Sequence, residues 1–138
     1  MNLPITLQLP YPKSVNDYYH TRKGGGRYIS AKGMAFKNKV KADYYELQPI
    51  ADSITLKIII HPRQNKDGSE HKVCIDIDNG NKCLLDSLNG IAYNDDKQIK
   101  KLIVEYGACK TGGGATVIID YFNQHECALL GRVPNCNI

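Results

Sequence analysis

Two aspartates and a lysine in one short stretch are the residues whose types and spacing best fit a chemical site. Asp76 and Asp78 flank Ile77, and Lys82 follows four residues after Asp78. In an extended segment alternate side chains share a face, so the two carboxylates lie together while Ile77 points toward a core. Two carboxylates this close repel each other unless a positive charge lies between them. Their hard oxygen ligands favour Mg²⁺, with Mn²⁺ as a substitute, over zinc.

Asp96 supplies a third carboxylate from a separate part of the chain. It follows Asp95, which we expect to serve a turn rather than to bind an ion directly. A divalent cation between three carboxylates suits phosphodiester hydrolysis, because it lowers the pKa of bound water and neutralises the pentavalent transition state. Lys82 then stabilises that state or orients the attacking water. An isolated D-x-D is usually a solvated turn. The prediction of a metal site therefore depends on the combination of D-x-D with Lys82 and Asp96.

The elements that must position these residues follow from apolar periodicity and turn signals. Ser30 is a suitable N-cap for a helix whose apolar face carries Phe36, Val40 and Tyr44. Asp78 or Asn79 is expected to cap a second, leucine-rich helix. In chain order we expect a strand over residues 5–9, a helix over 31–47, a strand over 54–60, a short extended segment over 72–78, a helix over 79–88, and strands over 99–106 and 115–122.

This order of elements predicts an α/β (α+β) fold. It indicates a single domain over residues 1–122, with one mixed β-sheet packed by two main helices. The last two strands are expected to form a hairpin through the glycine-rich residues 110–114. Residues 123–138 show no pattern and are expected to be a tail of unassigned role.

Basic side chains are concentrated in the N-terminal part of a chain whose net charge is only +4. Eight lysines and arginines lie between Lys13 and Lys41, against Asp17 alone. Such a segment suits a phosphate backbone, although an ordinary solvated surface explains it equally well. Interleaved tyrosines stack on unpaired bases or serve as packing residues, and Asn16 serves a turn or contacts a phosphate. The candidate DNA-binding residues are Lys13, Asn16, Tyr18, Tyr19, Arg22, Lys23, Arg27, Lys32 and Lys37.

Composition excludes several classes of protein. Apolar residues make up 42% of the chain and charged residues 23%, as in soluble globular proteins, and the apolar runs are too short to span a bilayer. Residues 1–4 do not resemble a secretory leader, so we expect a cytoplasmic protein. Five cysteines without a C-x-x-C spacing argue against a disulfide framework and a zinc ribbon. Zinc at His125 and Cys127 is a weaker alternative.

These motifs resemble the RusA family of Holliday junction resolvases. That family shows D-x-D-N, a lysine one turn on, an apolar helix, then D-D-x-Q-hydrophobic, after an N-terminal P-x-P-x-S-x-N-x-Y-Y and Y-x-S-x-x-G. The resemblance covers residues 3–122. The matching segments are Pro10 to Tyr19, Tyr28 to Gly33, Asp76-Ile77-Asp78-Asn79, Lys82, Leu85-Asp86-Ser87-Leu88-Asn89-Gly90 and Asn94-Asp95-Asp96-Lys97-Gln98-Ile99.

The resemblance implies a Mg²⁺-dependent homodimer that makes paired cuts in four-way DNA junctions, in recombination and repair, without a small-molecule cofactor or a membrane. The family's metal-binding aspartates fall on Asp76, Asp78 and Asp96, and its essential lysine on Lys82. A two-fold dimer matches the two equivalent strands of a junction. Members are often encoded by phages and prophages. Gly80 departs from the family's usual leucine, and we expect it to weaken the helix by up to about 1 kcal/mol.

Two other functions fit the same residues. A non-catalytic protein that coats branched or single-stranded DNA uses the same basic stretch, with salt-dependent binding and no cleaved product. A structural domain stabilised by Ca²⁺ or Mg²⁺ uses the same carboxylates without affinity for DNA.

Overall fold

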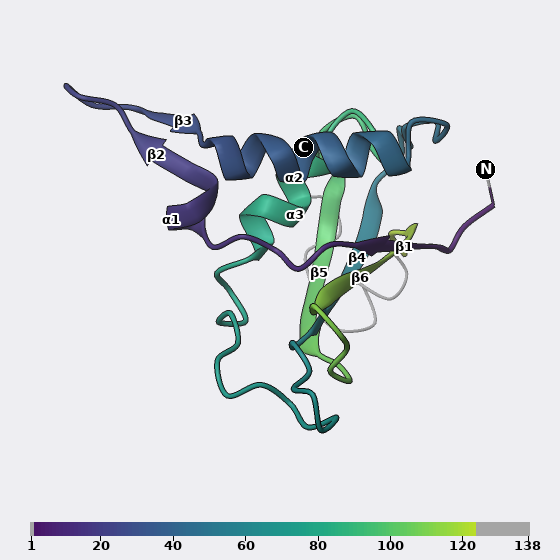
Figure 1. Cartoon of the computed structure of the whole chain (residues 1–138). Helices are drawn as coiled ribbons and strands as arrows, with labels where there is room; N and C mark the ends of the chain where they lie inside the picture. Colours follow the sequence, from purple (N-terminus) through teal and green to yellow (C-terminus); the bar gives the residue numbers. More distant parts are fainter. Residues whose placement is uncertain (1, 124–138) are drawn as a thin grey trace, which may run out of the picture.

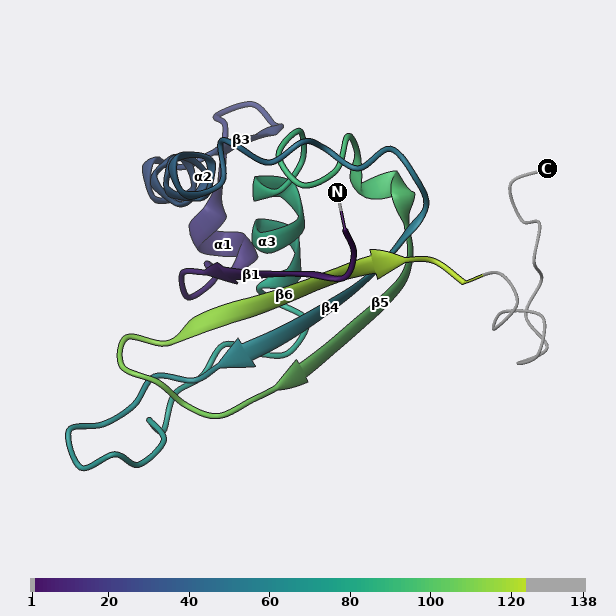
Figure 2. The same cartoon turned by 90° about the vertical axis from the view of Figure 1, so that its right-hand side faces the viewer.

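A four-stranded sheet with helices packed on one face accounts for most of residues 2–123, the part of the chain described by the computed structural model (Figures 1 and 2). The tail from residue 124, with His125 and Cys127, lies outside the described residues. The elements are β1 (Ile5–Leu9), α1 (Val15–Tyr18), β2 (Tyr19–Thr21), β3 (Arg27–Ile29), α2 (Ala31–Asp43), β4 (Ile54–His61), α3 (Asn81–Ser87), the 3₁₀ helix η1 (Asp96–Gln98), β5 (Ile99–Tyr106) and β6 (Gly114–Tyr121).

The sheet is mixed, as predicted, but the expected hairpin between its last two strands is wrong. The strand order is β1-β6-β4-β5, so β5 and β6 lie on opposite sides of β4. Strand β4 pairs parallel with β5 and antiparallel with β6. Gly107 and Lys110 donate backbone hydrogen bonds to the carbonyls of Ile60 and Pro62, both at 2.9 Å. These bonds carry the chain across the end of β4 instead of folding β6 back on β5.

The core forms where β4 meets the helices. Ile54, Leu56, Ile58 and Ile60 are each 0% exposed, as the period-two pattern of a strand with one covered face requires. They belong to one buried cluster with the apolar residues of α2 and α3. Burying a side chain of this size stabilises the fold by roughly 1.5–3 kcal/mol. The central strand therefore fixes the helices that carry the candidate site residues.

Helix α2 starts where the sequence predicts and ends four residues early. The Ser30 hydroxyl accepts the Gly33 N–H at 3.0 Å, which confirms the predicted N-cap. Helical residues end at Asp43, and Tyr44 bonds across to β1 instead. The Gln8 N–H donates to the Tyr44 hydroxyl at 2.7 Å, and that hydroxyl donates to the Gln8 carbonyl at 3.0 Å. This pairing with an adjacent strand accounts for the early end.

Gly33 is required by a close approach of two backbones. A Cβ at this position would lie 2.6 Å from the Tyr18 carbonyl oxygen and 2.8 Å from Cγ2 of Ile29. Helix α2 therefore packs directly on the end of α1. This close contact requires glycine, although glycine is less favourable than alanine within a helix.

We expect Gly33→Ala to lower the free energy of unfolding by about 1–3 kcal/mol, because a backbone oxygen must shift to admit the methyl group. Urea denaturation followed by circular dichroism measures this change. Asn38→Ala, at an exposed position on the same helix, is the control and should change stability by less than about 0.5 kcal/mol. An equal effect of both variants contradicts the packing argument.

Residues 15–29 contain structure that the sequence analysis treated as loop. Helix α1 spans one turn, and β2 and β3 form an antiparallel hairpin in which Tyr19 lies opposite Ile29. The glycines at the tip, residues 24–26, all have positive φ, which turns the chain there. This hairpin, residues 19–29, extends away from the sheet and is called the basic arm below (Figure 1). Within residues 2–123 no helix is long and apolar enough to cross a membrane.

Candidate active site

The Asp76–Asp78 segment is a turn rather than a strand. The Asn79 N–H donates to the Asp76 carbonyl at 3.0 Å, and both aspartates are exposed. Ile77 is 43% exposed, so the prediction that it points into a core is wrong. The physical reason is that the chain must reverse here to enter α3. The segment belongs to a connection over residues 62–80 with no helix or named strand, and connections of such length are usually functional.

The start of α3 is held by a close contact and not by a side-chain cap. Gly80 is the N-cap residue and supplies no capping hydrogen bond, so the predicted cap from Asp78 or Asn79 is wrong. Asn79 Oδ1 instead accepts the backbone N–H of Val15 at 3.3 Å. A Cβ on Gly80 would lie 2.9 Å from the Pro12 ring. Gly80 lies outside the helical residues, so its expected cost within the helix does not apply.

Asp96 is positioned by its two motif neighbours. Asp95 caps η1 by accepting the backbone N–H two residues on, while its own N–H donates to Gln98 Oε1 at 2.8 Å. The Gln98 amide also donates to the carbonyls of Ile50 at 2.7 Å and Asp52 at 2.9 Å. The predicted turn role of Asp95 is therefore confirmed, and the partly buried Asp96 is fixed against the start of β5.

The charges of Lys82 and Asp96 act on each other. Burial and a hydrogen bond with Asp95 raise the pKa of the Asp96 carboxyl, as do the charges of Asp95 and Asp86, whereas Lys82 lowers it. Lys82 lies in the first turn of α3, within electrostatic range of Asp96 although the two residues are distant in sequence. A lysine at this range from Asp96 is suited to stabilise the negative charge of a phosphate near that carboxylate.

Asp76 and Asp78 lie in a different environment. Besides burial and Cys74, their charges raise the pKa of Tyr106, whose hydroxyl donates to the Ile75 carbonyl at 2.8 Å. Tyr106 ends β5, while Asp96 precedes its first residue. Within residues 2–123 no three His, Cys, Asp or Glu side chains lie close enough together to hold a metal ion. Within the described residues the structure therefore places Lys82 within electrostatic range of Asp96 but does not gather the three aspartates around one point.

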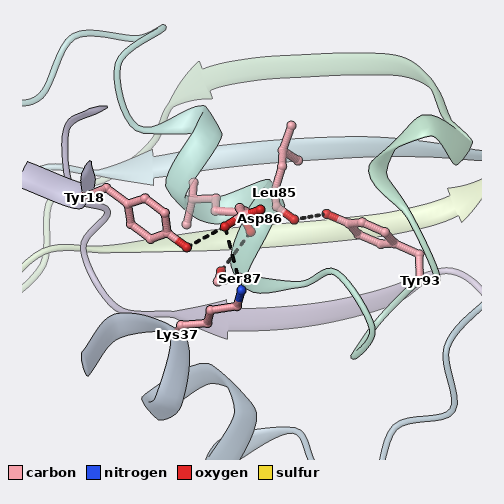
Figure 3. A network of polar contacts seen from close by, with 7 residues as sticks. Tyr18, Lys37, Leu85, Asp86, Ser87 and Tyr93 are labelled. Carbon is pink, nitrogen blue, oxygen red and sulfur yellow. Dashed lines mark hydrogen bonds and ion pairs between the residues drawn. The ribbon is translucent and has the colours of Figure 1, made fainter. Parts of the chain in front are cut away.

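Asp86 links polar side chains of three helices (Figure 3). The Tyr18 hydroxyl donates to Asp86 Oδ2 at 2.7 Å, and Lys37 Nζ lies 3.9 Å from the same oxygen. On the same helix the Leu85 carbonyl accepts the Tyr93 hydroxyl at 2.6 Å. The i+4 spacing of Lys82 and Asp86 on one helix favours a local pair, but the ion pair of Asp86 forms with Lys37 of α2. Tyr18 is 68 positions away, so no local signal could have found it.

The candidate DNA-binding residues lie along the basic arm, α1 and α2. Arg27 lies over the Tyr19 ring at 4.6 Å, and Arg22 over Tyr28 at 5.7 Å. Tyr18 is 0% exposed with its hydroxyl on Asp86, so it is a core residue and we withdraw it from that set. The others are exposed or partly exposed, namely Lys13, Asn16, Tyr19, Arg22, Lys23, Arg27, Lys32 and Lys37.

A shallow pocket with a volume of about 280 Å³ lies between α2 and the segment after β1. Lys13, Lys32 and Lys39 line it together with the aromatic rings of Tyr11 and Phe36. Lys39 was missed as a candidate, although its spacing of seven from Lys32 on one helix places the two on the same face. The pocket adjoins Pro12, which contacts the start of α3, and of its lysines Lys39 also pairs with Asp43 at 2.9 Å.

Exposed cations on an arm and in a pocket, next to carboxylates and a lysine, are typical of an enzyme that acts on the backbone of a nucleic acid. The mixed sheet with its helices carries them on an α+β fold. The family model described as endodeoxyribonuclease RusA matches residues 10–120, which is most of the chain. The chain therefore belongs to the RusA family, whose endodeoxyribonucleases resolve Holliday junctions by hydrolysing phosphodiester bonds. No curated protein matches it.

Proposed function

We propose that this chain is a Mg²⁺-dependent, structure-selective endodeoxyribonuclease that acts as a homodimer and makes paired cuts in four-way junctions. The finding that carries the proposal is the match of the family model to residues 10–120, and within that region the charge of Lys82 acts on the Asp96 carboxyl. The acidic turn of Asp76 and Asp78 leads directly into the same helix.

Asp76, Asp78 and Asp96 would hold the Mg²⁺ ion, because all three offer the hard oxygen donors that it prefers. When bound, the ion supplies an activated water and neutralises charge on the phosphate. Three carboxylates repel one another, so the turn with Asp76 and Asp78 approaches Asp96 when a cation lies between them. The connection over residues 62–80 offers the length for that approach, since helical residues begin only at Asn81.

Lys82 would bind the phosphodiester that is cut. Its side chain is exposed, and its charge already acts on Asp96 and Tyr19. A fixed ammonium beside the scissile phosphate stabilises the negative charge that develops on the oxygens during the attack. Lys82 therefore acts as the electrostatic partner of the phosphate.

The lysine pocket and the basic arm would bind the DNA arms around the cut. Lys13, Lys32 and Lys39 converge on one concave surface, which suits a backbone phosphate. The arginines over Tyr19 and Tyr28 leave cationic faces exposed on the arm. Contacts of this kind fix the register of DNA without reading its sequence.

Lys32→Ala with Lys39→Ala is expected to weaken junction binding and its dependence on salt. Loss of two phosphate contacts makes the slope of log K against log salt less steep by about 1.8. If the variant and the wild-type protein bind equally at 1 M salt, the variant therefore binds up to about 60-fold more weakly at 0.1 M salt. Fluorescence anisotropy in EDTA, at several salt concentrations, measures both. Lys41→Ala removes an exposed lysine of α2 that does not line the pocket. An equal effect of this control assigns the loss to net charge alone.

Apolar side chains along β5 support the homodimer. Leu102, Ile103 and Tyr106 are 41%, 37% and 47% exposed on a strand at the end of the sheet order. A long apolar strand at a sheet edge invites pairing with another chain. Two-fold pairing there gives two equivalent sites for the two strands of a junction. Sedimentation equilibrium at micromolar concentration is expected to give twice the mass of one chain.

One assay separates the proposed function from its alternatives. A synthetic four-way junction, a Y-fork and a linear duplex are incubated with the protein, in Mg²⁺ or in EDTA. We expect symmetric nicks in the junction with Mg²⁺ and intact DNA in EDTA. Binding without product under every divalent ion indicates a coating protein instead. A thermal shift with Mg²⁺ but no affinity for DNA indicates a metal-stabilised structural domain.

A further inference from the structure

A partly buried carboxylate joins the three helices beside the candidate site (Figure 3). Asp86 on α3 accepts the Tyr18 hydroxyl of α1 at 2.7 Å and pairs with Lys37 of α2 at 3.9 Å. Its side chain is 20% exposed, and Tyr18 is 0% exposed. Burial and the hydrogen bond to Asp86 raise the pKa of Tyr18, so the phenol stays protonated and remains the donor. Asp86 therefore links α3 to both neighbouring helices, by a hydrogen bond from α1 and an ion pair with α2.

Burial of the Asp86 carboxylate costs hydration free energy, and the attachment of α3 to the fold does not require it. Leu84 and Leu88 of the same segment are 0% exposed and already anchor it in the apolar core. A mostly buried carboxylate loses hydration, which its partners must replace. A charge-assisted bond between a phenol and a carboxylate is directional and strong. It therefore defines the placement of Tyr18 relative to α3 more narrowly than apolar packing does.

Tyr18 is where the basic arm begins. It ends α1, and Tyr19 opens β2 of the arm. The two rings meet edge to face at 4.8 Å, and Arg27 lies over Tyr19 at 4.6 Å. Besides burial, Asp86 raises the pKa of Tyr19, while Lys82 and Arg27 lower it. The base of the arm thus lies within electrostatic reach of Lys82, on the helix that also carries Asp86.

We infer that Asp86 is a positioning residue that fixes the basic arm relative to Lys82, so that DNA bound along the arm presents its phosphate to that lysine. The inference rests on the proposed function and adds a residue outside the predicted site. Asp86 acts through Tyr18 at the base of the arm and through the one helical turn that separates it from Lys82.

The test combines variants of the bonded pair with a matched control. Tyr18→Phe removes the donor and keeps the carboxylate, Asp86→Ala removes the acceptor, and Asp86→Asn keeps an acceptor oxygen without the charge. Tyr44→Phe is the control, because it deletes another tyrosine hydroxyl that bonds the Gln8 backbone of β1, away from the site. Three quantities are measured: the single-turnover cutting rate in Mg²⁺, junction affinity in EDTA, and hydrogen exchange of the arm amides.

We expect Tyr18→Phe and Asp86→Ala to slow cutting by roughly tenfold to a hundredfold, as small misplacements of a reacting group do. Junction affinity should change less than about threefold, which is smaller than the loss of one or two phosphate contacts. Exchange of the amides of residues 19–29 should rise. Asp86→Asn should recover part of the rate, and Tyr44→Phe should keep the wild-type rate and exchange.

Equal rate losses in Tyr18→Phe and Tyr44→Phe at matched thermal stability overturn the inference, as does unchanged arm exchange in Tyr18→Phe. If the wild-type protein does not cut the junction at all, the proposed function fails. The exchange comparison still decides whether Asp86 fixes the arm in that case. The two failures are therefore distinguishable.

Discussion

Asp78→Asn is expected to abolish Mg²⁺-dependent nicking of a four-way junction while junction affinity stays the same or rises. A neutral amide oxygen is a poorer ligand for Mg²⁺ than a carboxylate, and its loss of charge removes repulsion of the phosphate. Loss of an outer partner of a metal ligand already costs about 10–100-fold, so loss of a ligand should cost at least about a hundredfold. Gel separation of nicked products and anisotropy in EDTA measure the two effects.

Asp67→Asn is the matched control for this prediction. Asp67 is exposed on the same connection over residues 62–80, so its loss changes the local charge equally. Both positions are exposed, and stability should change by less than about 0.5 kcal/mol in either variant. Nicking at the wild-type rate by Asp78→Asn would remove the assignment of this aspartate to the metal.

Lys82→Ala is expected to slow cutting by about 10²–10³-fold, the usual cost of losing a fixed donor to a developing oxyanion. It should also shift the pH dependence. Lys82 lowers the pKa of Asp96, so its removal raises that pKa. Asp96 binds a cation only when ionised, and the active form is lost as pH falls through its pKa. The acid limb of the rate profile should therefore move to higher pH.

Single-turnover rates across the pH range measure both parts of this prediction. Lys97→Ala removes an exposed lysine next to Asp96 and serves as the control, with a rate close to that of the wild-type protein. Lys82→Arg keeps the charge and should leave the acid limb in place. If Lys82→Ala lowers the rate equally at every pH, without a shift of the acid limb, the predicted effect of Lys82 on the pKa of Asp96 is contradicted, whereas its role in catalysis is retained.

The strands could be predicted from the sequence because their signal is local. Alternation in β1 and the apolar, β-branched residues of β4 and β5 placed strands over residues 5–9, 54–60 and 99–106, within one residue of the observed bounds. The neighbours of each strand could not be predicted in the same way. Gly112 and Gly113 are typical of a hairpin, yet the chain passes across β4, since pairing depends on contacts distant in sequence.

In the candidate site, too, local motifs could be predicted from the sequence, and features that depend on contacts between distant residues could not. The D-x-D and D-D-x-Q motifs were recognisable because each works within a few residues, as the capping by Asp95 and Gln98 shows. Burial is a tertiary property, so the sequence could not decide whether a tyrosine among arginines packs in the core or contacts DNA. Tyr18 instead lies in the core against Asp86. Helix entry at Gly80, set by the Pro12 ring, was equally invisible to local spacing.

The pairing of β1 with β6 determines how late in synthesis the sheet can be completed. Ile5 lies opposite Ile119, so β1 cannot pair with its neighbour until a strand more than a hundred residues further along the chain has been synthesised. Closing so long a stretch of chain is slow. A nascent polypeptide that has emerged only as far as β5 lacks β6, the neighbour of both β1 and β4. Chains that stop before β6 should therefore be unable to complete the sheet on which the candidate site is built.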